Sequence, residues 1–267
     1  MLLVGRSYLR CIQSCHLELP GMLVILIAAT LNYLYCPDAI ICHILSFLPT
    51  KISVATSVLS KRWTYLWRNI PALSFSSTEF TDGFIDHVYK VLAMFQTQTI
   101  YQFTLHFEPT PTVDALHIYP WILTALERNV QELKLNFGTT PGQLVRLPSP
   151  IFSCKTLVCL KLFDATLMDI PTNGRKCRKS LPAIALRCMS TNLEMIKLTG
   201  FCDQKCNWKF VQYVLTNTEV LKEMKIGTSL HMKNRSRRLK NLLEYPRAST
   251  ACEISFFIDS SGQDFHL

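Results

Sequence analysis

A repeated triplet, in which two apolar residues flank one other residue, predicts short β-strands along most of this chain. Alternation of this kind places the apolar residues on one face of a strand. The third residues of successive triplets are 30, 30, 27, 36, 28 and 30 positions apart. The sequence therefore predicts one strand in each repeat of about 30 residues. The triplets are Leu73-Ser-Phe75, Phe103-Thr-Leu105, Leu133-Lys-Leu135, Leu160-Lys-Leu162, Ile196-Lys-Leu198, Met224-Lys-Ile226 and Ile254-Ser-Phe256.

Helices are predicted between several of these strands, at 84–94, 120–128, 209–215 and 239–243. Alternating strands and helices build a parallel sheet, because each crossover returns the chain to the same end of the sheet. At this spacing the predicted fold class is α/β, with a leucine-rich-repeat solenoid in which a curved parallel sheet carries outer helices. An ordinary α/β domain is the alternative.

An amphipathic helix is predicted upstream of the first strand. Its apolar residues recur at the i, i+1, i+4, i+5 and i+8 positions of one helical face. Pro37 suits the first turn, and Pro49 suits the stop. The apolar residues are Ile40, Ile41, Ile44, Leu45 and Leu48.

Two shorter helices are predicted to follow. One begins at Thr50 as its cap and buries Val54, Val58 and Leu59. The other begins at Ser60, ends before Pro71, and brings Trp63, Leu66 and Trp67 to one side. Three helices in about 35 residues cannot bury this much apolar surface alone. The remainder either packs on the rest of the chain or is kept for a partner.

These helices carry a motif that resembles a known family. Pro37-Asp38, residues 44–51 and 54–63, and Leu66-Trp67 together resemble the F-box of plant F-box proteins with leucine-rich repeats. In that family, the three-helix F-box docks on a Skp-type adaptor, which connects the protein to the cullin and RING subunits of a ubiquitin ligase. Cys36 stands where the family usually has leucine, so a smaller apolar contact is implied there.

The resemblance assigns a set of residues to adaptor docking or to the packing behind it. These are Pro37, Ile40, Ile41, Ile44, Leu45, Leu48, Pro49, Leu59, Trp63, Leu66 and Trp67.

The resemblance continues along the repeats with lower specificity. Residues 121–122, 129–135, 147–148 and 152–162 resemble the first repeats of the same family, and 193–201, 220–226 and 245–249 resemble its C-terminal FBD segment. Family members commonly carry more repeats before that segment, so an internally shortened array is implied. The predicted organisation is an atypical apolar leader over 1–35, an F-box over 36–70, leucine-rich repeats over 71–190, FBD-like repeats over 191–258 and a tail over 259–267.

Composition excludes disorder over the whole chain, because 49% of the 267 residues are hydrophobic and only 18% are charged. The net charge of +9 is concentrated in residues 171–267, which hold 16 basic and 8 acidic side chains. Two basic clusters there could bind nucleic acid, an import receptor or an acidic partner, or could be solvated loops. The clusters are Arg175, Lys176, Arg178 and Lys179, then Lys233, Arg235, Arg237, Arg238 and Lys240.

We predict that Lys233, Arg235, Arg237 and Arg238 serve nuclear import. No zinc-finger or helix-turn-helix pattern accompanies these residues, so no specific nucleic-acid partner is expected.

The apolar leader leaves two interpretations open. Residues 19–35 carry no charge over 17 positions, whereas a spanning helix needs about 20 mainly apolar residues. The segment is either a membrane or export segment or a packed leader. Export would separate an F-box from its intracellular partners, and the odd number of cysteines, 11, favours reduced thiols. We expect a protein of the nucleus, the cytoplasm or both, without a membrane partner.

No catalytic or cofactor motif is found. The G-x-G-x-x-G, phosphate-loop, G-x-S-x-G and H-E-x-x-H patterns are all absent from the sequence. Two cysteine and histidine groups lack the paired spacings of a zinc site, so no metal or cofactor is expected. They are Cys188, Cys202, Cys206 and His231, and Cys11, Cys15 and His16.

The expected function is the substrate-recognition subunit of a Skp-cullin-F-box ubiquitin ligase, non-catalytic itself, whose repeats bind an unknown protein substrate. The alternative is an interaction protein outside the ligase, tethered to membrane by residues 19–35 or to nucleic acid by the basic C-terminal third.

Overall fold

The computed structural model describes most of the chain between residues 36 and 258. The described residues are 36–107, 115–137, 148–163, 192–201, 205–228 and 235–258. The leader, the first basic cluster and the tail lie outside them.

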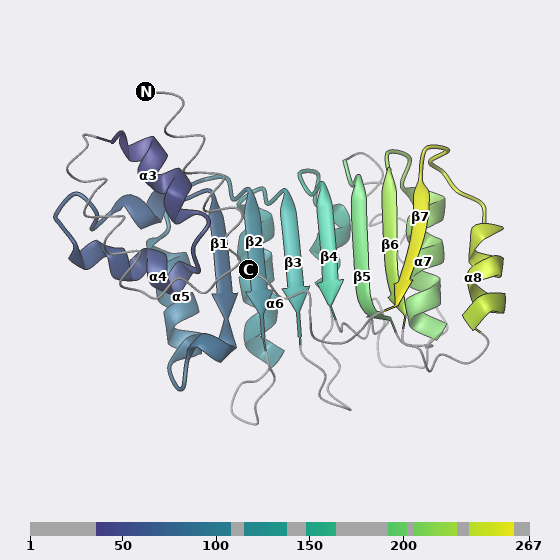
Figure 1. Ribbon diagram of the computed structural model, residues 1–267, viewed down its shortest axis with the longest axis horizontal. Helices are drawn as coiled ribbons and strands as arrows, with labels where there is room; N and C mark the ends of the chain where they lie inside the picture. The colour runs from purple at the N-terminus through teal and green to yellow at the C-terminus, as the bar shows by residue number, and fades with distance from the viewer. Residues whose placement is uncertain are drawn as a thin grey trace.

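A parallel sheet of seven strands runs along the described part of the chain, in the sequential order β1 to β7 (Figure 1). Every neighbouring pair is parallel, which confirms the α/β class and the parallel sheet. The strands are β1 (Ala72–Ser76), β2 (Gln102–His106), β3 (Glu132–Asn136), β4 (Cys159–Phe163), β5 (Met195–Phe201), β6 (Glu223–Thr228) and β7 (Glu253–Ile258).

The register aligns the predicted triplets. The third residues, Phe75, Leu105, Leu135, Leu162, Leu198, Ile226 and Phe256, are paired from each strand to the next. Those of β1 to β6 are buried, and Phe256 packs against the core. One slip of register would move a whole strand's apolar set to the other face, so burial fixes this alignment.

Helices cover one face of the sheet. The α-helices are α5 (Phe84–Met94), α6 (Ile118–Glu127), α7 (Lys205–Asn217) and α8 (Arg235–Leu243). Short 3-10 helices accompany them at η3 (Ser77–Glu79), η4 (Ala115–His117) and η5 (Ser149–Ser153). All four predicted helices are present, and the last three begin earlier than expected. In Figure 1, α6 and α7 lie behind the strands, so the front of the sheet carries no helix of the described residues at β3 to β6.

The helices before the sheet lie beside its first strand. They are α3 (Asp38–Leu45), α4 (Thr50–Ala55), η1 (Thr56–Val58) and η2 (Leu66–Asn69). Their buried side chains belong to the same hydrophobic core as the sheet, which runs from Ile41 to Cys252. Part of the apolar surface that three short helices cannot bury alone is therefore packed on the rest of the chain.

Thr50 joins these helices to the sheet. The sequence predicts that its side chain caps a helix, but Thr50 makes no capping hydrogen bond and Pro49 occupies the cap position. Its fully buried hydroxyl instead accepts a 2.8 Å hydrogen bond from the Ser74 amide of β1. An edge strand needs such partners for its backbone groups. Thr50 therefore provides an acceptor for a backbone amide of the edge strand β1 rather than for an amide at the start of its own helix.

Candidate docking surface

Helix α3 presents two different faces. On the inner face, Ile41 and Leu45 are buried in the core. On the outer face, Ile40 is 50% exposed and Ile44 is half-buried, and Phe47, in the following turn, is 44% exposed. Positions three and four apart lie on one side of a helix, so the outer residues form a continuous apolar ridge. With the exposed Pro37 we call this ridge, Pro37, Ile40, Ile44 and Phe47, the α3 stripe.

The eleven predicted F-box residues separate by exposure. The buried ones are Ile41, Leu45, Trp63, Leu66 and Trp67, the half-buried ones are Ile44, Leu48, Pro49 and Leu59, and the exposed ones are Pro37 and Ile40. The buried residues therefore pack in the core, whereas the half-buried and exposed residues keep side-chain surface that a partner can contact.

Phe47 and Val58 are exposed apolar residues that the sequence analysis did not assign to this surface. Phe47 could have been found by its spacing of seven from Ile40 along the stripe. The prediction that Val58 is buried is wrong, because its side chain is 84% exposed. The α-helix ends at Ala55 and continues as the 3-10 helix η1. A 3-10 helix turns about 120° per residue instead of 100°, which rotates Val58 away from the side that Val54 occupies.

The predicted third helix is also shorter than expected. The chain makes turns from Ser60 to Tyr65, where Trp63 N–H donates to Ser60 O at 3.0 Å and Leu66 N–H donates to Trp63 O at 3.3 Å. These i to i+3 bonds lead into the 3-10 helix η2 in place of an α-helix. The two tryptophans and Leu66, which the sequence predicts on one side of a helix, are all buried in the core.

Asp38 and Arg62 connect the two ends of this region. Arg62 Nε and Nη2 donate to Asp38 Oδ1 at 2.8 and 2.6 Å, and Nη2 also contacts the Cys36 carbonyl. The pair is solvent-exposed, so it adds little to stability. The two donors share one carboxylate oxygen, and this contact links the start of α3 to the turns before η2.

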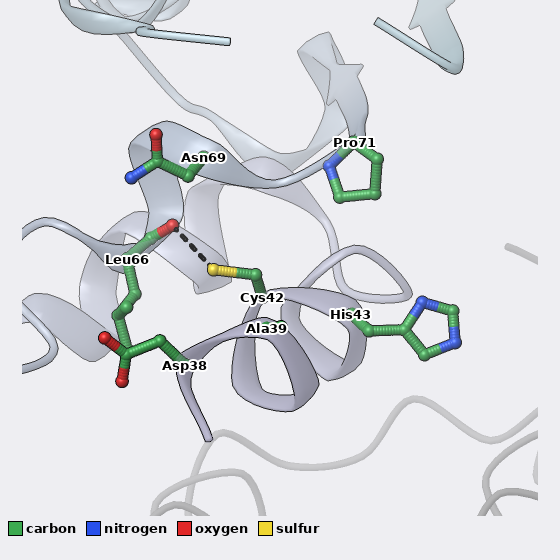
Figure 2. Close-up of a pocket in the computed structure, with 7 residues that line it drawn as sticks. All are labelled: Asp38, Ala39, Cys42, His43, Leu66, Asn69 and Pro71. Carbon is green, nitrogen blue, oxygen red and sulfur yellow. Dashed lines mark hydrogen bonds between the residues drawn. The ribbon is translucent and has the colours of Figure 1, made fainter.

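A shallow pocket of roughly 480 Å³ lies between α3 and η2 (Figure 2). It is lined by Asp38, Ala39, Cys42, His43, Leu66, Asn69 and Pro71. The Cys42 thiol contacts the Leu66 carbonyl at 3.4 Å, and burial, with the charge of Asp38, raises the pKa of that thiol. A protonated thiol is a poor nucleophile, and the exposed His43 packs its ring on Phe47, with 4.9 Å between ring centres. The pocket therefore offers a shaped surface and no catalytic pair.

Other predicted features lie partly outside the described residues. Within the described ranges, no cluster of three or more potential ligands could hold a metal ion. In the same ranges, no helix is both long enough and apolar enough to span a bilayer. The leader, Cys11, Cys15, His16, Cys188, Cys202 and His231 lie outside the described residues, and Cys206 is in the first turn of α7. In the import cluster, the backbone from Arg235 onward is helical in α8 and Arg237 is exposed, so this segment is not the loop that one interpretation allowed.

Comparison with known families finds two domains. The F-box domain matches residues 34–74, and FBD matches residues 182–226. The first match contains α3, α4, η1, η2 and most of β1, and the second includes β5 and α7. No solved structure matches the chain.

Curated proteins of Arabidopsis thaliana are similar to this chain. The F-box/FBD/LRR-repeat protein At2g04230 is 41% identical over 56% of this chain and 35% of its own length. The F-box/LRR-repeat protein At4g14103 is 42% identical over 47% and 34%. The F-box protein At4g09920 is 34% identical over 57% and 48%. The chain thus spans between a third and a half of these relatives. It carries F-box and FBD domains and is a homologue of the F-box/FBD/LRR-repeat proteins of Arabidopsis thaliana.

Proposed function

We propose that this protein is the substrate-recognition subunit of a Skp-cullin-F-box ubiquitin ligase. Its F-box docks on a Skp-type adaptor, and the adaptor connects it to the cullin and RING subunits. F-box proteins generally act in this role. The observation that carries the proposal is the division of α3 into a buried face and an exposed apolar stripe. The buried face joins the helix to the shared core, and the stripe is left for the adaptor.

The repeats form the substrate-binding part, as a leucine-rich-repeat solenoid. Support comes from the strictly sequential parallel sheet, the period near 30 residues and the helices on one face. Such an array leaves the opposite face of the sheet accessible to a protein partner. The chain itself supplies no reactive group to the transfer of ubiquitin, which belongs to the other subunits. We place the protein in the nucleus, the cytoplasm or both.

The α3 stripe provides the test of adaptor docking. Ile40→Ala combined with Phe47→Ala removes two exposed side chains without opening the core. Because apolar anchors at an interface contribute about 1 kcal/mol or more each, the affinity for a Skp-type adaptor should fall about thirtyfold or more. Leu116→Ala with Tyr119→Ala is the matched control, since these side chains are 73% and 47% exposed at η4 and α6.

Titration calorimetry of each variant of this chain with the purified adaptor gives the affinities, and circular dichroism checks the fold. The control variant should bind as tightly as the wild type. Unchanged affinity of the folded α3 variant, or an equal loss in both variants, would refute docking through the α3 stripe.

A further inference from the structure

A row of four lysines crosses the face of the sheet that carries no helix of the described residues (Figure 1). Lys134 pairs with Lys161, Lys161 with Lys197 and Lys197 with Lys225, on the adjacent strands β3 to β6. Each is the middle residue of its triplet, so it points away from the face that buries the apolar residues. With neighbouring strands about 4.8 Å apart, the row is about 14 Å long. We call it the lysine ladder.

Two glutamates of the same face partly neutralise the ladder. Glu132 Oε1 lies 2.7 Å from Lys161 Nζ and 3.5 Å from Lys134 Nζ, and Glu223 Oε1 lies 2.8 Å from Lys225 Nζ. Like charges on adjacent strands repel one another, and these pairs offset that cost. Lys197 lies inside the row and has no carboxylate partner among the described residues. Within the part of the chain that the structure describes, Lys197 is therefore the lysine of the ladder whose charge no carboxylate offsets.

Two aromatic rings lie near the ammonium group of Lys197. Lys197 Nζ lies 5.6 Å from the ring centre of Phe163 and 5.3 Å from that of Phe257. Phe257 belongs to β7, two strands from Lys197, and it reaches across β6 at Gly227. A Cβ added at Gly227 would lie 2.7 Å from the ring of Phe257. The absence of a side chain there makes the aromatic contact possible, and the rings hold Lys197 in place without cancelling its charge.

We propose that the lysine ladder is the docking site for an extended acidic segment of the protein substrate, a proposal that rests on the proposed function. The complementary partner carries carboxylates at alternate positions. Same-side residues of an extended peptide are about 6.8 Å apart, so three acidic side chains span about 14 Å, the length of the ladder. The Phe163 and Phe257 rings provide apolar contact for the intervening side chains.

The charges of this face favour a peptide over a nucleic acid. Glu132 and Glu223 lie beside the ladder on the same face of the sheet, and they repel a backbone that carries a phosphate at every step. A peptide with spaced carboxylates can approach Lys197 and the outer sides of its neighbours while avoiding both glutamates.

Fluorescence anisotropy of the full chain tests this site. The ligand is a labelled ten-residue peptide of alternating glutamate and serine, compared with the same peptide carrying glutamine for glutamate. The acidic peptide should bind at least tenfold more tightly than the neutral one. Lys134→Gln with Lys197→Gln should weaken binding of the acidic peptide at least tenfold, and it leaves the Lys161–Glu132 pair intact. Lys90→Gln with Lys209→Gln removes the same charge from exposed positions of α5 and α7 and should change binding less than twofold.

Three outcomes would overturn the proposal. In the first, the acidic and neutral peptides bind equally. In the second, the ladder and control variants lose the same affinity for the acidic peptide. In the third, single-stranded DNA of matched charge binds more tightly than the acidic peptide, and the ladder variant loses that binding. Capture of the adaptor is measured in parallel. If the ladder proposal fails, the chain still captures the adaptor. If the proposed function fails, the acidic peptide still binds, and Ile40→Ala with Phe47→Ala does not lower adaptor affinity.

Discussion

At the scale of single residues, the half-buried Glu132 and Lys161 are held in their charged forms by the ion pair between them. Burial alone would raise the pKa of Glu132, but the hydrogen bond to Lys161 and the charges of Lys134 and Lys161 outweigh burial and lower it. Burial would likewise lower the pKa of Lys161, and its bond to Glu132 raises it instead. Both shifts favour the charged pair.

The pH dependence of stability follows from these directions. The carboxylate contribution is complete above the unfolded pKa near 4.5 and is lost as pH falls through the lower folded pKa. The lysine contribution is complete below the unfolded pKa near 10.5 and is lost as pH rises through the higher folded pKa.

Glu132→Gln should therefore lower the free energy of unfolding by about 1 kcal/mol at pH 7, and the loss should be smaller at pH 3.5. Urea unfolding measures this difference, and Glu253→Gln in the same row of β7 is the control. A deficit that stays constant down to pH 3.5 would contradict the assignment.

Gly227 links local packing to the lysine ladder. Gly227→Ala places a methyl group against the far end of the Phe257 ring, which is a flexible neighbour and can rotate away. The free energy of unfolding should change by less than about 1 kcal/mol, because the substitution also reduces the entropy of the unfolded chain. The ring would leave Lys197, so the acidic peptide should bind about two to three times more weakly. Anisotropy and urea unfolding of the same sample check both statements, and unchanged peptide affinity would argue against a role for the ring.

At the scale of elements, the sequence predicts helices and strands better than it predicts which way they face. The spacing of Ile40, Ile41, Ile44 and Leu45 indicates α3, yet both the buried and the exposed apolar residues belong to that same pattern. Only packing against η2 and the shared core decides that Ile41 turns inward and Ile40 outward. Val58 shows the same limit, because a change from α-helix to 3-10 helix leaves no clear signal in six residues of sequence.

The strands were more predictable than the helices before them. Two apolar residues in a period-two triplet specify both a strand and its buried face, and repetition specifies the register. The ladder was also visible in principle, since lysine is the central residue of four successive triplets. Its meaning depends on knowing that those triplets align on adjacent strands, and that Lys197 alone among the four has no carboxylate partner in the described residues.

At the scale of the whole molecule, the F-box helices and the sheet share one core. Trp63 and Trp67 are buried in the same cluster as Leu73 and Phe75 of β1. Replacing either tryptophan by alanine would therefore disturb folding before it could report on adaptor docking, with a cost of about 3–5 kcal/mol. The exposed α3 stripe is the part of the F-box whose substitution separates binding from stability.

A shared core predicts that the F-box helices and the first strand open together. Thr50→Val keeps the shape of the side chain but removes the acceptor of the Ser74 amide. The loss of a buried hydrogen bond costs about 1–3 kcal/mol when the remaining donor is left unpaired.

Hydrogen exchange followed by mass spectrometry should show equal opening free energies for peptides from α3 and from β1, and Thr50→Val should lower both by the same amount. Peptides from β7 serve as the control, because elements far along a repeat array open independently of its first strand. If only the α3 peptides lost protection, the F-box would be a separately folding unit and the Thr50–Ser74 bond would not couple it to the sheet.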